Sequence, residues 1–502
     1  MHKIGFDSDK YIKEQTKYIL ERVKTSSGRL YIECGGKLLH DKHAARVLPG
    51  FDENNKMKVF KELKEHLDII ICIYAGDIEQ RKIRGDFGIS YDADVLKMIH
   101  DFASYGLKCD KVVITRFENQ VAAVQFKRKL EQRGIKVYEH TATPGYPSEI
   151  DVVVSEEGYG KNPYIPVDAP VVIVTAPGPG SGKLATCLNQ MYHEAKMGKK
   201  PNYAKLETFP IWNLPLNHPV NIAYEAATVD IGDVNLIDHF HHDAYSEVTV
   251  NYSRDLEAYP ILKRILEKIT GEECIYKSPT DMGVNRCGFG IIDDEVCRHA
   301  ANMEIIRRVF HTKTDYLQGI CSKEVYNRAL ALLDKAHLAE EDRPTVVPAR
   351  EILKKAIEEH KGKDDGTVCA AALELDDGRI ITAHNSNLMH AGAALILNAC
   401  KAIIGIDKDV DLIHNEVIKA VTHTKRDILS SKGVSLNVDE ILIALSISGI
   451  YDENAKNASE ALKQLRDTDV HFTHIPSAGD IDGLRKLGIN YTSEPQYPGR
   501  NI

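Results

Sequence analysis

The sequence predicts an α/β protein with an N-terminal Rossmann-like or P-loop-like parallel sheet, a largely helical middle region and a C-terminal α+β domain. Unbroken apolar runs alternate with helical periodicity through the first 200 residues, which is typical of a parallel sheet covered on both faces. A glycine-rich loop at 176–183 directly follows one of these runs, as in a phosphate-binding fold. An Asp-Asp-Gly-Arg turn at 376–379, followed by an alanine-rich helix, predicts a C-terminal hairpin packed against a helix.

The N-terminal strands are expected where apolar, often β-branched residues run together, at 30–33, 68–74, 111–115, 136–138, 151–155 and 171–174. Apolar residues three or four positions apart predict helices at 54–66, 92–105 and 119–134. Ligands of a parallel sheet bind at the carboxyl ends of its strands, which is where the 176–183 loop would lie.

The middle region begins at 201–222 with a proline-rich crossing segment, expected to be ordered but irregular, which carries the single tryptophan, Trp212. Helical patterns follow at 255–269, 293–310, 322–336 and 349–359, and residues 340–347 form the best linker candidate. These changes of pattern predict three domains, at 1–200, 201–345 and 346–502, as expected for a chain of 502 residues.

The last part has strand patterns at 368–375, 379–384 and 469–474, and helical patterns at 390–404, 410–430, 437–448 and 479–487. A hairpin, then His390-Ala-Gly392 and a helix, is the order that opens the cytidine-deaminase-type fold. Zinc deamination also needs a glutamate and a P-C-x-x-C helix, but Gly392 occupies the glutamate position and no P-C-x-x-C occurs. We therefore expect a deaminase-like topology without zinc ligands, in which His390 is structural.

Composition excludes several classes of protein. Apolar residues make up 43% and charged residues 27% of the chain, as in an ordinary globular protein. A net charge of −9 without a basic block argues against nucleic acid or an anionic membrane as the main partner. The N-terminus has no apolar signal core, and ten cysteines are scattered without a C-x-x-C, which predicts a cytoplasmic protein with reduced thiols.

The glycine-rich loop contains the residues predicted to bind a cofactor phosphate, which are Gly178, Gly180, Ser181, Gly182 and Lys183. Glycines let successive N–H groups point at one anion, the following helix adds its positive end, and the lysine adds a charge. The pattern G-x-x-x-x-G-K-(S/T) is incomplete, because Pro177 replaces its first glycine and Leu184 its magnesium-binding hydroxyl. A phosphate site, with a nucleotide and magnesium as the cofactor hypothesis, and a plain turn are equally open.

Two further loops follow predicted strands. Arg81 and Arg84, with Lys82, form the densest positive charge beside a strand end, and guanidinium groups suit phosphate binding. A solvated loop neutralised by neighbouring acidic residues is the equal alternative. For the segment 33–37, Glu-Cys-Gly-Gly-Lys, a tight turn is favoured over an anion site, because glycine pairs mostly mark turns.

The densest run of ligand-type side chains is Asp238-His-Phe-His-His-Asp243. Its last three residues, His241, His242 and Asp243, are the predicted catalytic acid–base groups. No H-E-x-x-H or comparable spacing is present, so no metal ligands are assigned. The polar segment 278–286 is expected to open a helix rather than to close over a ligand.

Five long and unusual strings are spread through the chain: Tyr31-Ile-Glu-Cys-Gly-Gly-Lys-Leu, His43-Ala-Ala-Arg-Val-Leu-Pro-Gly-Phe, Pro177-Gly-Pro-Gly-Ser-Gly-Lys, Lys205-Leu-Glu-Thr-Phe-Pro-Ile-Trp-Asn-Leu-Pro and Ser278-Pro-Thr-Asp-Met-Gly-Val-Asn. Over essentially its full length the chain thereby resembles the bacterial UPF0371 family, also called DUF1846. The resemblance implies a cytosolic, multidomain α/β protein, and it implies no catalytic residues, since no reaction is established for the family. A protease is not expected, because the chain has no G-x-S-x-G and no zincin motif.

The leading functional prediction is a protein that binds a phosphorylated small molecule, foremost a nucleotide, at 176–183. One alternative is a non-catalytic scaffold or regulatory protein, which Leu184 at the magnesium-ligand position favours. Another is a transferase acting on a sugar phosphate or nucleotide precursor, which needs a phosphate loop without that hydroxyl. The small residues of the 391–402 helix allow close packing either within the domain or across a homo-oligomer.

Overall fold

The computed structural model describes residues 3–25, 28–84, 88–431 and 433–499. Over these residues the chain forms two compact units. The N-terminal unit comprises Ile4–Glu225 and Gly232–Ala301, and the C-terminal unit comprises Ala226–Ile231 and the chain from Asn302 onward. The three-domain division at 1–200, 201–345 and 346–502 stays a prediction.

The N-terminal unit is built on a six-stranded sheet in which every neighbouring pair of strands is parallel. Side by side, its strands are β6 (Lys136–His140), β5 (Lys111–Thr115), β2 (Leu67–Tyr74), β7 (Val171–Thr175), β1 (Leu30–Cys34) and β8 (Asn202–Leu206). The inner strand β7 is buried along its whole length. The predicted α/β fold with a parallel sheet of apolar strands is confirmed.

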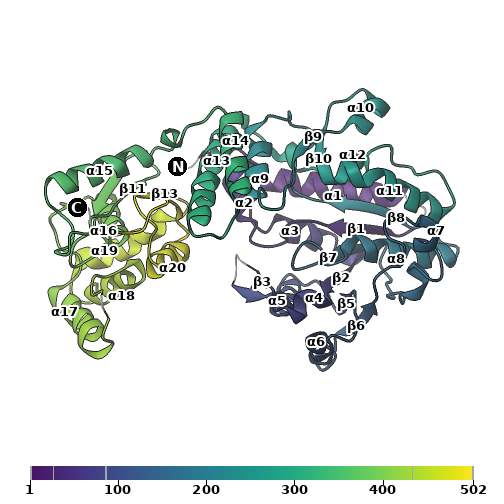
Figure 1. The fold of residues 1–502 in the computed structure, drawn as a ribbon, viewed down its shortest axis with the longest axis horizontal. Helices are drawn as coiled ribbons and strands as arrows, with labels where there is room; N and C mark the ends of the chain where they lie inside the picture. The colour runs from purple at the N-terminus through teal and green to yellow at the C-terminus, as the bar shows by residue number, and fades with distance from the viewer. Residues whose placement is uncertain (1–2, 26–27, 85–87, 432, 500–502) are drawn as a thin grey trace. The chain divides into compact units, whose positions relative to one another are not determined.

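Helices cover both faces of this sheet, which is why its inner strands are apolar on both sides. Figure 1 shows α1 (Ser8–Thr25) and α8 (Lys183–Lys196) on opposite sides of it. On the α8 side, Tyr31 and Val174 of the sheet share an apolar cluster with Cys187 and Leu188.

The other elements as far as α12 are α2 (Lys42–Val47), α3 (Asn55–Glu62), α4 (Ala75–Glu79), β3 (Ile83–Arg84), β4 (Ile89–Ser90), α5 (Tyr91–Ser104), α6 (Val121–Glu131), α7 (Ile150–Val153), α9 (Pro219–Ala227), β9 (Asn235–Ile237), α10 (His239–Tyr245), β10 (Val250–Tyr252), α11 (Ser253–Thr270) and α12 (Pro279–Met282).

Two expectations for this unit are wrong. The segment 151–155 is not a strand, because the short helix α7 places Ile150 and Val153, three positions apart, together in the apolar cluster beside α8. The proline-rich segment 201–222 is not wholly irregular, because it contains β8. This edge strand has β1 as its partner in the sheet and keeps Asn202 and Lys205 partly exposed, so it needs no unbroken apolar run.

The C-terminal unit contains a four-stranded sheet in the order β12 (Ile380–His384), β11 (Ala370–Glu374), β13 (Asp469–Phe472) and β14 (Asn490–Ser493). Strand β11 is antiparallel to β12 and β13, whereas β13 and β14 are parallel. The predicted hairpin at the Asp-Asp-Gly-Arg turn is confirmed. The helices from α13 onward are α13 (Asp294–Leu317), α14 (Lys323–Lys335), α15 (Val346–Glu358), α16 (Ala391–Ile404), α17 (Asn415–His423), α18 (Val438–Ser448), α19 (Glu453–Ala461) and α20 (Ala478–Leu487).

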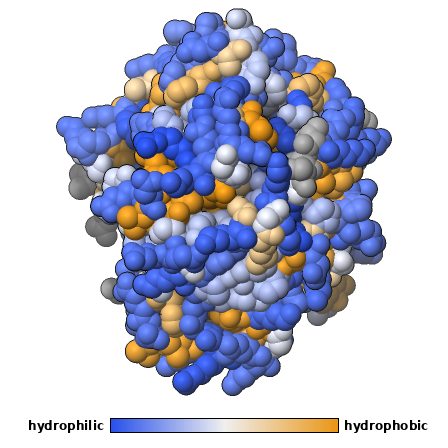
Figure 2. All heavy atoms as spheres, turned by 90° about the vertical axis from the view of Figure 1, so that its right-hand side faces the viewer, coloured by the Kyte–Doolittle hydropathy of each residue, from blue (hydrophilic) through white to orange (hydrophobic). Residues whose placement is uncertain are grey.

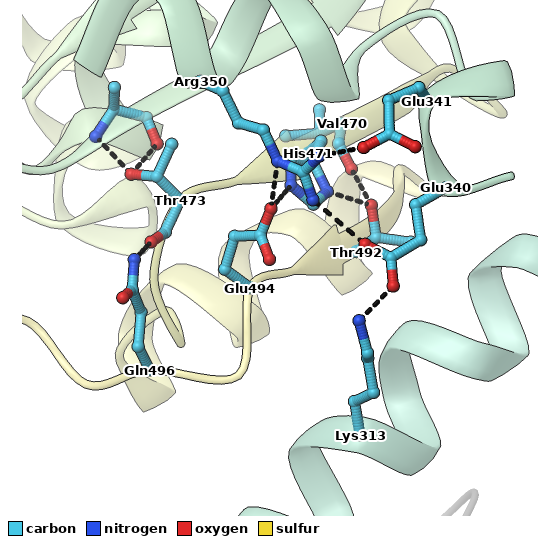
Figure 3. Close-up of polar contacts among 11 residues, drawn as sticks. Lys313, Glu340, Glu341, Arg350, Val470, His471, Thr473, Thr492, Glu494 and Gln496 are labelled. Atoms are coloured by element: carbon cyan, nitrogen blue, oxygen red, sulfur yellow. Dashed lines mark hydrogen bonds and ion pairs between the residues drawn. The ribbon is translucent and has the colours of Figure 1, made fainter. Parts of the chain in front are cut away.

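A chain of ion pairs ties the edge strand β14 to the helices beside it (Figure 3). Arg350 of α15 donates from Nε to Glu494, which directly follows β14, at 2.6 Å, and its other nitrogens pair with Glu340 and Glu341. The fully buried His471 of β13 lies with Nε2 3.4 Å from the same Glu494 carboxylate. Although burial opposes ionisation, the hydrogen bonds from His471 and Arg350 lower the pKa of Glu494 to about 2.

We expect Glu494→Gln to remove part of the acid sensitivity of this unit. The pKa of Glu494 is about 2 in the folded protein and about 4.3 in an unfolded chain. The ionised carboxylate therefore stabilises the fold fully at pH values above about 4.3. This contribution is lost as the pH falls from about 4.3 toward 2. Thermal melting followed by far-UV circular dichroism is expected to show wild type more stable than Glu494→Gln at pH 6, with the difference shrinking through this window. A difference in thermal stability that does not change with pH would contradict the lowered pKa of Glu494.

On the side of the N-terminal unit that carries α8 and α11, hydrophilic side chains cover most of the surface, and hydrophobic ones lie in separate patches (Figure 2). Scattered apolar residues of this kind are normal on a protein surface. Among the described residues, no helix has the length and apolar character needed to cross a bilayer.

Candidate functional site

The loop between β7 and α8 has the backbone form that an anion site needs. Gly180 and Gly182 have φ angles of 73° and 90°, a region that favours glycine. Gly182 is also the N-cap of the 14-residue helix α8, and no side chain of the described residues caps this helix. A Cβ atom built on Gly180 would meet nothing within 4 Å among those residues, so the loop has an open side.

The carboxyl end of β5 holds this loop in place. Thr115, the last residue of β5, donates its hydroxyl hydrogen to the Ser181 carbonyl at 2.8 Å. The next residue, Arg116, donates to the Gly180 carbonyl at 2.5 Å and stacks on the Tyr74 ring, with Cζ 3.4 Å from its centroid. The loop is therefore supported by side chains that the sequence interpretation did not single out.

The hydroxyls near the start of α8 are already used within the protein. Ser181 donates from Oγ to the Gly178 carbonyl at 3.0 Å. Thr186 is fully buried and lies with Oγ1 3.4 Å from Cys72 Sγ. Leu184 packs against the apolar cluster, so the start of α8 offers no hydroxyl for a magnesium ion. No group of three or more His, Cys, Asp or Glu side chains in the described ranges is arranged to hold a metal ion.

Lys183 is the cation at the start of α8. It is half-buried and forms no hydrogen bond or ion pair with the residues that the structure describes. It follows β7, which neighbours β1 in the sheet, so Lys183 lies at the same edge of the sheet as Cys34 at the end of β1. Burial raises the pKa of the Cys34 thiol to about 11, Lys56 and Lys183 oppose the rise, and the carboxylates of Glu207 and Glu33 add to it.

A cluster of charged side chains lies at the carboxyl ends of β1 and β8. Lys205 pairs with Asp255 of α11 at 2.6 Å and with Glu207 at 3.4 Å. In the sheet, Lys205 lies opposite Glu33, whose carboxylate accepts a hydrogen bond from the Tyr203 hydroxyl at 2.7 Å. We call Glu33, Lys205, Glu207 and Asp255 the carboxylate cluster.

Burial gives this cluster unusual protonation behaviour. Burial raises the pKa of Glu207, Lys205 opposes the rise, and the charges of Asp255 and Glu33 reinforce it. Burial by itself would lower the pKa of Lys205, but the charges of Asp255, Glu207 and Glu33 hold this pKa above its ordinary value. A buried carboxyl with a raised pKa beside a permanently charged lysine is suited to take up and return a proton.

Gly35 lets the Glu207 carboxylate pack directly on the turn that follows β1. A Cβ atom on Gly35 would lie 2.3 Å from Glu207 Oε1, and the Gly35 carbonyl accepts a hydrogen bond from the buried Lys56 ammonium at 2.8 Å. On the other side, the Glu207 amide donates to Asn285 Oδ1 at 2.7 Å. The turn, the carboxylate and the 278–285 segment are therefore joined at one place.

We expect Gly35→Ala to displace the Glu207 carboxylate and to destabilise the N-terminal unit by about 1–3 kcal/mol, the usual cost of overpacking. Urea unfolding followed by the fluorescence of Trp212, the single tryptophan, reports on this unit, because its indole donates to the Asn285 carbonyl at 2.9 Å. Gly433→Ala is a suitable control, since a Cβ there meets nothing within 4 Å among the described residues. Equal stabilities for the two variants would show that Glu207 moves away at no cost.

The two arginines predicted to assist phosphate binding lie in different surroundings. Arg81 is exposed and has a φ angle of 49°. Arg84 is tied to the buried Asp94, with Nη1 2.7 Å from Oδ2. Residues 85–87 of the same segment lie outside the described residues. No contact of either arginine with the 176–183 loop is found among the described residues.

The predicted catalytic residues of α10 lie apart from the loop. His241 is buried and has Nδ1 2.8 Å from the Ser278 hydroxyl, which itself caps α12, as expected for that segment. His242 and Asp243 are exposed, with His242 Nδ1 3.9 Å from Asp243 Oδ1. Figure 1 shows α10 well separated from α8. The three residues are therefore not brought together with Lys183.

The sequence interpretation did not select the carboxylate cluster. Its members are separated by up to 222 positions, from Glu33 to Asp255, and they become neighbours only when β8 pairs with β1 and Asp255 of α11 pairs with Lys205. One signal was available. Glu33 and the pair Lys205 and Glu207 lie within two of the five unusual strings, and each string contains the end of a strand.

Comparison with known proteins extends over the whole chain. A family model described as "Domain of unknown function DUF1846, N-terminal" matches residues 4–337, and the corresponding C-terminal model matches residues 341–502. A UPF0371 protein of Clostridium tetani (strain Massachusetts / E88) is 55% identical over 500 residues, covering 100% of this chain and 99% of that protein. A UPF0371 protein of Clostridium botulinum (strain Alaska E43 / Type E3) is 54% identical over 501 residues, with the same coverage.

Proposed function

Because the chain belongs to the DUF1846 family, whose members carry the name UPF0371 protein and no named reaction, we propose its function from the site geometry. The N-terminal unit binds a phosphorylated small molecule, foremost a nucleotide, at the carboxyl ends of β7, β1 and β8. The phosphate lies against the loop 176–183.

One observation carries this proposal. Lys183 is a half-buried cation without a partner among the described residues, and it lies at the uncapped start of α8 beside two glycines of positive φ. An unpaired cation and open N–H groups at the start of a helix both favour an anion. A plain turn would need neither the lysine nor the supports from Thr115 and Arg116.

The carboxylate cluster supports a catalytic role. Glu207 would accept a proton from a substrate hydroxyl and return it to a leaving group, while Lys205 pairs with Asp255 nearby. Ser181 and Thr186 are engaged and Leu184 is apolar, so this site favours transfer chemistry on a sugar phosphate or nucleotide precursor over magnesium-dependent hydrolysis.

Two finer assignments of fold belong to this proposal. The N-terminal sheet would act as a P-loop-like or Rossmann-like sheet that has lost the magnesium ligand. The C-terminal unit would have a deaminase-like topology without zinc, for which its strand order β12-β11-β13-β14 and the helix after its hairpin are the support. A non-catalytic scaffold is the second candidate, favoured by Leu184.

Thermal stability measured against a panel of phosphate compounds tests the proposal. Inorganic phosphate, nucleoside mono- and triphosphates and sugar phosphates are each added with and without magnesium. A ligand present at a hundred times its dissociation constant is expected to stabilise the folded state by about 2.7 kcal/mol. Stabilisation by a monophosphate without magnesium supports a transferase that acts on a sugar phosphate or nucleotide precursor. If no compound changes the thermal stability, phosphate binding is overturned and the non-catalytic scaffold remains as the candidate function.

A further inference from the structure

A second group of chemically active side chains lies in the C-terminal unit, where three helices begin. Helix α16 begins after His390, α18 after Asn437 and α20 after Ser477. All three starts meet at the Asp480 carboxylate. It receives His390 Nδ1 at 2.8 Å, the Ser477 hydroxyl at 2.6 Å and the Val438 amide at 2.9 Å.

These contacts leave Asp480 fully engaged and orient His390. Asp480 is 2% exposed, and although burial opposes its ionisation, the hydrogen bond from His390 helps to hold its pKa below the usual range. An ionised carboxylate only accepts hydrogen bonds, so His390 carries its proton on Nδ1. The other ring nitrogen, Nε2, has no hydrogen-bond partner among the described residues, and the side chain is 27% exposed. The imidazole is therefore fixed at one end and available at the other.

The first turn of α16 has backbone N–H groups without an acceptor among the described residues. The His390 side chain does not cap this 14-residue helix. The backbone N–H groups of Ala391, Gly392 and Ala393 have no acceptor within the part of the chain that the structure describes, although all three residues are buried. Buried N–H groups at a helix start normally find a partner in the protein, in water or in a ligand.

A neighbouring histidine also lacks a partner. His474 is 7% exposed, and its Nδ1 makes no hydrogen bond with any described residue. Its ring lies edge-on to Phe472 at 5.8 Å, and the Phe472 ring lies against Gly392 at the start of α16. Burial lowers the pKa of His474 to about 4, and the charges of Asp480, His390 and Lys363 also act on it. The Lys363 ammonium forms no ion pair within the described ranges. The surroundings thus offer unsatisfied donors and a free cation.

We propose that His390, His474 and the first turn of α16 bind the oxyanion group of a small molecule, a carboxylate or a phosphate. The N–H groups of Ala391 to Ala393 donate to the oxyanion, and the positive end of the helix favours its charge. His390, held by Asp480, donates from Nε2 when its ring carries both protons. Neutral His474 places its single ring proton on Nδ1 and donates as well, while Lys363 supplies the countercharge.

This site is separate from the one in the N-terminal unit, since all of its residues belong to the C-terminal unit. Its occupation does not depend on Lys183. The two proposals can therefore fail independently.

Histidine-selective NMR of the full chain tests the inference. The ring Cε1 signals of His390 and His474 are assigned with His390→Asn and His474→Asn and are followed during titration with sodium acetate and with inorganic phosphate, in wild type and in Lys183→Ala. We expect saturable movement of both signals in both backgrounds. Saturation by one anion and not by the other identifies the group that the site prefers.

The variants separate binding from structure. In His390→Asn the amide nitrogen can keep the contact with Asp480 while Nε2 is lost, so we expect a folded protein with affinity about tenfold weaker, measured on the His474 signal. His384→Asn, in β12 of the same unit, is the matched control and should leave the affinity unchanged. Signals that do not move, or that drift without saturating, would overturn the proposal. The proposal would also be overturned if the His390 and His474 signals no longer moved on titration in the Lys183→Ala variant.

Discussion

Lys183→Ala is expected to weaken the binding of the phosphorylated ligand by about 10-fold to 100-fold, the equivalent of one hydrogen bond to a charged group. The lysine forms no ion pair with the described residues, so its removal costs the free protein little. In the complex, the phosphate would lose its only contact with a full positive charge from the loop. Isothermal titration calorimetry with the best compound of the stability panel measures the change.

Lys196→Ala is the matched control for this experiment. Lys196 lies at the other end of α8, is 55% exposed and pairs with Glu156. Exposed ion pairs contribute little to stability, so this variant should bind as wild type does. If Lys183→Ala and Lys196→Ala bind equally well, the 176–183 loop is a turn and the ligand lies elsewhere.

Lys205→Met is expected to produce the largest loss of stability, about 3–5 kcal/mol, because it leaves carboxylates uncompensated in a buried site. The side chains of Lys205 and Asp255 are only 19% and 18% exposed. Without the lysine, Asp255 and Glu207 repel each other. Urea unfolding followed by Trp212 fluorescence measures the loss in the N-terminal unit.

Two variants make this result specific. Lys111→Met removes a similarly buried lysine, 12% exposed, which pairs with Asp68 at 2.7 Å and Asp110 at 3.3 Å. We expect a comparable loss of stability but unchanged ligand affinity, whereas Lys205→Met alters both. Adding Asp255→Asn to Lys205→Met should recover part of the stability. A single Lys205→Met variant as stable as wild type would show that the cluster is solvated and unsuited to proton transfer.

The fold could be predicted where the physics is local. The buried strands could be predicted because a strand covered on both faces has an apolar run at its centre. The run 112–114 is fully buried, and the segment 111–115 forms β5 with the predicted bounds. The edge strands β8 and β14 were not predicted, since one side of an edge strand can stay polar. Helix α7 was misassigned because a run of four apolar and acidic residues fits either structure, and its packing beside α8 decides.

One part of the candidate site could be predicted from the sequence and the other could not. The loop 176–183 could be recognised from the sequence, because its chemistry lies in consecutive residues. The carboxylate cluster could not, since nothing local distinguishes Glu207 or Asp255 from a surface acid. Their burial, and the raised pKa of Glu207, arise only when β8 pairs with β1 and α11 packs beside it.

The sequence by itself determined the α/β class, the buried strands of the N-terminal sheet, the C-terminal hairpin and the glycine-rich loop, because each depends on neighbours along the chain. The tertiary structure alone decided which charged groups meet. It left Lys183 without an ion pair among the described residues, placed His241 against Ser278, and brought His390 to Asp480 across 90 positions. Charges interact through space, and the distances between them are set by packing rather than by sequence separation.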